Sequence, residues 1–402
     1  MSSAFTRALR ALPPSPDLRH LKDEARDLLR AGVATSLTHA QFQIARSYGF
    51  ESWPKLKVHV ELLKESGQLK QAIDRDDLER VRELMTRNPS LHRSPLGYGG
   101  GGPLTWAAEC RSSAPSDARL AIAEWMMHNG SDVHQGGDAP LTRAALRGER
   151  IPMMDLLIAH GADVNARWNG WFPILFAPCE SAQPTAIMWL LQHGADPNTR
   201  GSKGETALDY LLEGYARSRQ FGRCVEVLIS AGGRTRNDIP GVLPIVEDRP
   251  DRLAALLEAI PDLIRRPLPD LRLGNTGARR LIVAGATLLH VAAEFGNAEA
   301  ARDLIARGAD VNARAAIDGG GIGGQTPLYH AVAQYDDWGL EVARVLLEAG
   351  ADLSVRATIP GSYENEEEFV DCTPLEYAQR FPGAEFPGSN EKTLRLLTEW
   401  RA

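Results

Sequence analysis

The stretch Gly308-Ala309-Asp310-Val311-Asn312 closes a unit that recurs along the chain. Variants of this phrase stand at residues 130–134, 161–165, 194–198 and 350–354. The first three of these begin 31 and then 33 residues apart, whereas the copies that begin at Gly308 and Gly350 are 42 residues apart. Self-similarity at a period of roughly 20 to 50 residues is typical of stacked repeats, so it predicts the architecture before any single element is considered.

A second phrase precedes the first by the length of about two short helices. In the unit that ends at Asn312 it reads Thr287-Leu288-Leu289-His290-Val291-Ala292-Ala293, and related phrases begin at Pro103, Pro140, Pro173, Thr206, Thr326 and Thr373. Thr is a good N-cap. Pro is tolerated directly after it, because the backbone N–H that Pro lacks would have no hydrogen-bond partner in the first turn of the helix. An apolar second helix then ends at a Gly suited to a left-handed C′ position. One such unit cannot bury its own apolar face, so the units must stack.

These two phrases, recurring in step, resemble the ankyrin repeat, and residues 287–312 are close to its pattern. The resemblance implies an all-α solenoid of about eight or nine helix-turn-helix repeats with hairpin loops. It also implies a scaffold that holds a protein, peptide or other ligand on its concave face. Residues 40–57 resemble a segment that precedes the array in bacterial ankyrin proteins, which suggests a bacterial source.

The predicted organisation has three parts. They are a flexible tail at residues 1–14, an N-terminal helical module at 15–66 and a repeat array at 67–402. Within the module, Thr38 is predicted to cap a helix that stops at Gly49. Insertions are predicted near residues 94–102, 267–285 and 357–371. Such insertions map to one face of a repeat array, often the binding face; a solvated loop is the favoured interpretation for any one of them, whereas the three together favour a function.

Composition narrows the function classes. The 402 residues carry a net charge of −7, which argues against a broad nucleic-acid surface. Residues 45–57 superficially resemble a helix-turn-helix, but nearby acidic residues offset their basic ones. The four cysteines are far apart and suggest neither a zinc site nor a disulfide framework. No apolar run approaches the ~20 residues that span a bilayer, and no signal peptide is recognised, so we expect a cytoplasmic protein without cofactor or metal.

The first helix of each repeat lines the concave face of such a solenoid, so polar and aromatic side chains there are candidates for ligand contact. The predicted binding residues are Trp106, Glu109, Arg143, Trp168, Trp171, Phe176, Tyr210, Phe295, Tyr329, His330, Tyr335 and Tyr377. The aromatic residues on the first helices fit the core equally well. Arg143 and His330 stand where the family prefers Leu, and a charge buried alone is costly, which favours the groove. In ankyrin proteins the histidine at the position of His290 bonds to the neighbouring loop.

An enzyme built on the solenoid is the alternative. His330 with Glu294 and Asp371 could supply acid–base chemistry if the fold brings them together. The sequence has no GxSxG elbow, no HExxH motif and no phosphate-binding glycine loop. The binding scaffold is therefore the preferred hypothesis.

Overall fold

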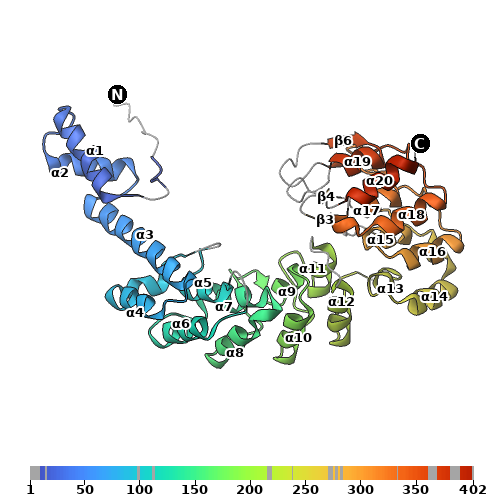
Figure 1. Cartoon of the computed structure of the whole chain (residues 1–402), viewed down its shortest axis with the longest axis horizontal. Helices are drawn as coiled ribbons and strands as arrows, with labels where there is room; N and C mark the ends of the chain where they lie inside the picture. Colours follow the sequence, from blue (N-terminus) through green and yellow to red (C-terminus); the bar gives the residue numbers. More distant parts are fainter. Residues whose placement is uncertain are drawn as a thin grey trace. The chain divides into compact units, whose positions relative to one another are not determined.

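The computed structural model describes residues 10–13, 16–96, 100–110, 114–214, 220–237, 239–269, 275–276, 279–280, 284–332, 334–360, 369–380 and 390–400. The fold divides into two compact units. The first comprises Met1–Ala144 with Glu149–Asp163, and the second Ala145–Gly148 with Val164–Ala402. Helices dominate both units, as Figure 1 shows, which confirms the predicted all-α class. The predicted tail is described only at residues 10–13, where Arg10 forms an ion pair with Glu24 at 2.9 Å.

The first unit opens with three helices, α1 (Leu18–Arg30), α2 (Leu37–Ser47) and α3 (Trp53–Asp74). Their apolar faces share one small core that includes Leu21, Ile44 and Leu56. The predicted boundary between the helical module and the repeat array lies between residues 66 and 67. The structure instead has a single helix of 22 residues. Gly67 is accommodated inside it, because a lone glycine weakens a packed helix without ending it.

The rest of the first unit consists of helix pairs. Their elements are α4 (Leu78–Arg87), η1 (Pro89–Arg93), α5 (Pro103–Glu109), α6 (Asp117–His128), α7 (Gln135–Ala145) and α8 (Ile151–Ala159), with η3 (Gly148–Arg150) between α7 and α8. Short second helices such as α6 expose one side and bury the other, where Ile122 and Met126 are fully buried. The second helices α6 and α8 contact each other, as do α4 and α6.

The second unit continues the same pattern. Its elements are β1 (Arg167–Trp168), β2 (Phe172–Pro173), α9 (Phe176–Glu180), α10 (Pro184–Gln192), α11 (Ala207–Glu213), α12 (Phe221–Ser230), α13 (Val242–Val246), α14 (Pro250–Ala259), η4 (Pro261–Ile264), β3 (Asn275–Thr276), β4 (Arg279–Arg280), α15 (Leu288–Glu294), α16 (Ala298–Ala306), α17 (Pro327–Val332), η5 (Tyr335–Asp337), α18 (Leu340–Glu348), β5 (Ala357–Pro360), β6 (Phe369–Cys372), α19 (Pro374–Arg380) and α20 (Glu391–Trp400). Residues 240–266, which lack the repeat phrase, still form the helix pair α13 and α14.

Neighbouring repeats stack through like helices. In the second unit the first helices α15 and α17 contact each other, and so do the second helices α16 and α18 (Figure 1). The side chains between them, among them Leu289, Leu304 and Leu346, have no solvent exposure. Each repeat thus covers the apolar face of the one before it, which is the stacking that the repeat phrases predict.

The asparagine that ends the phrase ties each repeat to the next. The side-chain amide of Asn198 donates to the carbonyl oxygen of Gly232 at 3.0 Å, and its oxygen accepts from the backbone N of Arg234 at 3.0 Å. Asn312 makes the same pair of contacts with Gly350 and Asp352, which belong to the repeat that follows it. The side chain therefore satisfies backbone groups at the C-terminal end of the next second helix, which would otherwise lack partners.

Among the described residues of the second unit, antiparallel pairs of strands are formed by β1 with β2, β3 with β4, and β5 with β6. The strands β5 and β6 stand on either side of the predicted insertion at residues 357–371, of which residues 361–368 lie outside the described part of the chain. Within the described residues, no helix has both the length and the apolar character needed to cross a bilayer.

Candidate binding surface

A cluster of aromatic side chains surrounds the hairpin of β1 and β2. Trp168 pairs with Phe172 across the hairpin, and Gly170 at the turn has φ +77°, a left-handed conformation that favours glycine. The Trp171 ring lies 6.4 Å from that of Trp168 and 5.4 Å from that of Phe172, between ring centroids. We call Trp168, Trp171 and Phe172 the aromatic hairpin.

The aromatic hairpin is anchored in the core of the second unit. Phe172 packs edge to face on Phe176 at 5.8 Å and on Tyr210 at 5.6 Å, and those two rings stack at 4.6 Å. Phe176 is buried at the start of α9, whereas Trp171 is 49% exposed. One continuous set of rings therefore links the interior to a tryptophan in solvent. A large apolar side chain held in this way loses little conformational freedom on binding.

Several other aromatic residues of the predicted binding set lie in the core. Tyr329 and Tyr377 have no exposure and pack against each other at 5.9 Å, so they are closed to a ligand in this structure. Trp106 is also buried; its Nε1–H donates to the Asp74 carboxylate at 2.8 Å, and Lys70 covers its ring. The side chain of Tyr335 lies outside the described part of the structure.

The charged candidates are paired. Arg143 forms an ion pair with Glu109 at 2.9 Å, and each side chain is 18% exposed. This pair links the first helices of two successive repeats, α5 and α7, so the guanidinium has the partner that partial burial demands. His330 does not reach into a groove. It has no exposure and its Nδ1 lies 2.9 Å from the Glu294 carboxylate, which is likewise enclosed.

The structure thus joins two members of the predicted acid–base set. The side chains of His330 and Glu294 have no solvent exposure, and the pair joins α15 to α17. Asp371 lies on β6, where it accepts from Arg356 at 2.9 Å. The four cysteines are free and buried, and desolvation raises the pKa of Cys224 to about 12, which keeps that thiol protonated.

The histidine position of the repeat phrase makes contacts between repeats. His290 Nδ1 accepts from the backbone N of Thr287 at 3.0 Å, and its Nε2–H donates to the carbonyl oxygen of Gln325 at 3.1 Å. Desolvation, and then the neighbouring His330 ring, lower the pKa of His290 to about 3. The predicted bond to the neighbouring loop is confirmed. Tyr329, in the same position one repeat on, donates its hydroxyl to the carbonyl oxygen of Cys372 at 2.5 Å.

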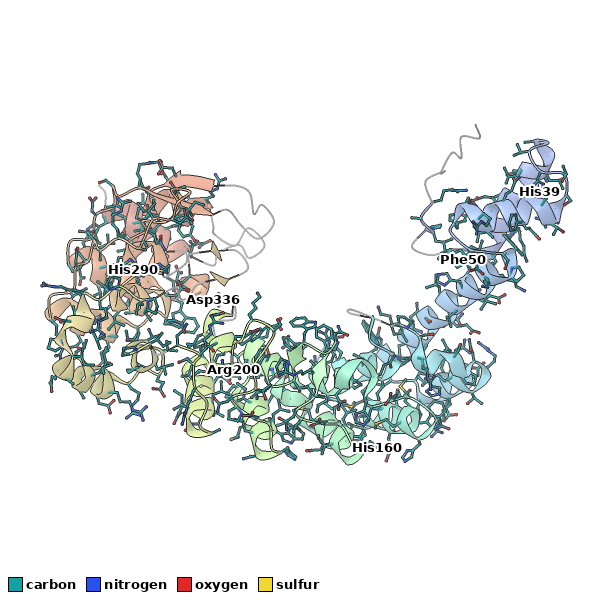
Figure 2. The ribbon with its side chains drawn as sticks, turned by 180° about the vertical axis from the view of Figure 1, so that it is seen from behind. His39, Phe50, His160, Arg200, His290 and Asp336 are labelled. Atoms are coloured by element: carbon teal, nitrogen blue, oxygen red, sulfur yellow. The ribbon has the colours of Figure 1, made fainter. Side chains whose placement is uncertain are left out.

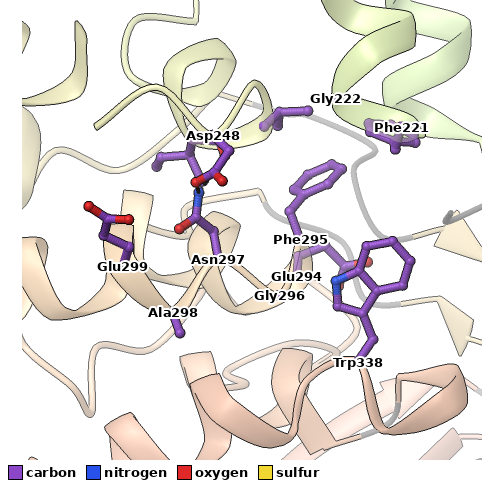
Figure 3. A pocket seen from close by; sticks show the side chains of 12 residues that line it. Phe221, Gly222, Asp248, Glu294, Phe295, Gly296, Asn297, Ala298, Glu299 and Trp338 are labelled. Atoms are coloured by element: carbon purple, nitrogen blue, oxygen red, sulfur yellow. Dashed lines mark hydrogen bonds between the residues drawn. The ribbon is translucent and has the colours of Figure 1, made fainter. Parts of the chain in front are cut away.

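A hollow of about 330 Å³ lies beside Phe295, another aromatic residue of the predicted binding set. Figure 3 shows its walls: Phe221 and Phe295, with ring centroids 5.3 Å apart, and Trp338, with Asp248 and Glu299 at the rim. Sequence reasoning missed Phe221 and Trp338. They come from separate repeats and bear no relation to the repeat phrase, so only the stacking brings them together.

Comparison with known proteins agrees with this geometry. A sequence profile of ankyrin repeats, with three copies, matches residues 104–201 and 253–357, together half of the chain. The chain belongs to the ankyrin-repeat family. Ankyrin repeats are generally protein-interaction scaffolds, and that is the class of function that the family assigns to this protein.

One matching relative is alpha-latrocrustotoxin-Lt1a from Latrodectus tredecimguttatus. It is 31% identical to this ankyrin-repeat chain over 115 residues, which are 28% of this chain and 8% of the toxin. The chain therefore spans only a small part of that relative's length.

Proposed function

We propose that this ankyrin-repeat protein is an interaction scaffold whose aromatic hairpin anchors a protein or peptide against the face lined by the first helices. The observation that carries the proposal is the exposure of Trp171, at 49%, on a hairpin whose Phe172 ring is buried and whose Trp168 ring is partly exposed. About half of the Trp171 surface stays open to solvent, and tryptophan is enriched where interfaces concentrate their binding energy. The hairpin is already ordered, so a partner does not have to order it on binding.

The other predicted binding residues differ in where they lie relative to Trp171. Trp168 and Tyr210 are partly exposed and adjoin Trp171 through Phe172, so they extend the apolar contact. Phe176 supports the hairpin from beneath. The partly exposed pair of Arg143 and Glu109 lies in the first unit and is not part of the aromatic hairpin.

The test is selection of peptides from a random phage-displayed library on the full chain, followed by affinity measurement with Trp171→Ala. We expect selected peptides to lose about thirty-fold or more in affinity, the effect of removing a hot-spot residue worth about 2 kcal/mol. Trp400→Ala is the matched control, because Trp400 on α20 is similarly exposed, at 44%, and lies outside the aromatic hairpin.

Equal loss in both variants, or full binding by Trp171→Ala, would contradict this placement of the site. Circular dichroism of both variants checks that the repeats remain folded. Failure of the library to yield any peptide that binds the wild-type chain would count against the scaffold proposal itself.

A further inference from the structure

Three potential metal ligands meet on the second helices of neighbouring repeats in the first unit. Glu124 and His128 lie four residues apart on α6, so they share one face of that helix. His160 follows the end of α8 (Figure 2). One potential ligand atom from each of the three side chains lies within 4.8 Å of the others.

The two imidazoles are held close together. The His128 and His160 ring centroids are 5.0 Å apart with an interplanar angle of 81°. His128 Nδ1 lies 3.0 Å from the carbonyl oxygen of Glu124, to which it can donate its hydrogen. That hydrogen bond leaves the lone pair on Nε2, and metal-bound histidines commonly donate their other ring N–H to a carbonyl in this way.

We propose that Glu124, His128 and His160 bind a zinc ion that fastens these two ankyrin repeats together. Two imidazoles and a carboxylate are a ligand set that zinc accepts, with water in the fourth position. Tetrahedral bonds of about 2.0–2.1 Å place ligand atoms about 3.3 Å apart, so the three atoms must approach each other. Glu124 and His128 are exposed and His160 is half-buried, so side-chain rotation can bring them together without moving the helices.

A zinc ion there would act as a cross-link. The helices α6 and α8 already contact each other, and a bond from each to one ion adds a connection that the unfolded chain lacks. Zinc should therefore stabilise the first unit, by an amount that grows with the logarithm of the free zinc concentration above the dissociation constant. Ankyrin packing alone does not demand an acidic side chain beside these two histidines.

The chain supplies a matched control at the same position of a later repeat. His193 precedes the glycine of its repeat phrase, as His160 does, and its Nδ1 lies 2.8 Å from the carbonyl oxygen of Trp189. Its ring stacks on Trp189 at 3.8 Å, and it belongs to no group of three clustered ligands among the described residues. His193→Ala therefore removes a histidine of the same kind without touching the proposed site.

The first experiment is calorimetric titration of Zn²⁺ into the full chain, without a polyhistidine tag, in a buffer that does not chelate zinc. We expect one saturable equivalent of zinc. His128→Ala and His160→Ala should each weaken binding at least tenfold, Glu124→Gln should weaken it less, and His193→Ala should leave it unchanged. No saturable binding by the wild-type chain, or equal binding by the double variant of His128 and His160, would overturn the proposal.

A second readout tests the cross-link. Excess zinc should raise the melting temperature of the wild-type chain and of His193→Ala, but not that of the double variant, whose fold is checked by circular dichroism without metal. His128 is exposed and His160 only half-buried, so the double variant should keep its fold. Zinc binding without any thermal shift would overturn the cross-link, and a shift that persists in the double variant would assign the effect to another site.

Discussion

At the residue scale, different side chains at one position of the repeat form hydrogen bonds to the backbone. His290, Tyr329 and Asp209 all occupy this position. His290 and Tyr329 bond to backbone at the start of the following repeat, whereas Asp209 accepts from the backbone N of Arg236 at 3.0 Å, at the end of its own repeat. A donor ring, a hydroxyl and a carboxylate require different backbone partners. In these three repeats, different side chains at this position therefore each satisfy a backbone group through a hydrogen bond.

His290 gives a pH prediction at this scale. Its pKa falls from about 6.5 in the unfolded chain to about 3 when folded, so below pH 6.5 the unfolded chain binds the extra proton. This contribution to stability is complete above pH 6.5 and is lost as the pH falls toward 3, by about 2 kcal/mol at pH 5. His290→Gln should lower the free energy of unfolding at pH 7 by about 1–3 kcal/mol. Between pH 7 and 5, the free energy of unfolding of this variant should fall less than that of the wild-type chain.

Urea unfolding at both pH values measures this. The control is His20→Gln on the exposed face of α1, which should match the wild-type chain. Parallel pH profiles for the wild-type chain and His290→Gln would contradict the assignment.

At the element scale, helix ends decide where each repeat turns. Ser36, rather than Thr38, caps α2, because its hydroxyl accepts from the backbone N of His39 at 3.1 Å. Both residues are good caps, so local chemistry did not separate them. The long helix α3 shows the converse: its apolar positions on both sides of Gly67, including Val60 and Leu69, are buried, and this packing keeps the helix continuous.

A pair of glycines gives a prediction at this scale. Gly296 has φ +67°, and a Cβ there would lie 2.1 Å from Trp338 in the wall of the hollow. Gly194 has φ +90° but open space around it. Gly194→Ala should cost only backbone strain, about 1–2 kcal/mol, whereas Gly296→Ala should cost about 1–3 kcal/mol more through the overlap. Chemical unfolding of the two variants checks the order, and equal losses would show that Trp338 moves aside freely.

At the scale of the whole molecule, the division into two compact units should govern unfolding. Repeats contact only their neighbours, so a lost contact weakens its surroundings first. Leu157→Ala on α8 and Leu346→Ala on α18 each remove a fully buried side chain, and each should cost about 2–5 kcal/mol. We expect hydrogen exchange to speed up mainly in the unit that carries the substitution. Uniform loss of protection across both units would show that the chain unfolds as one cooperative block.

The sequence by itself determined the repeat architecture, because both phrases place helix starts, helix ends and small residues at a regular period. It also indicated the bridging role of His290 and the aromatic residues of the hairpin. It did not reveal which rings are buried: Trp171 and Phe172 are neighbours in sequence, yet one is half-exposed and the other buried.

Only the tertiary structure decided which distant residues meet. Glu294 and His330 are 36 residues apart, and stacking turns them into a buried pair rather than a groove site. His128 and His160 come together in the same way. Metal sites were judged in the sequence from the spacing of the cysteines, which did not indicate this pair of histidines. The physical reason is that contacts between repeats depend on side-chain direction and packing, which a periodic phrase specifies only on average.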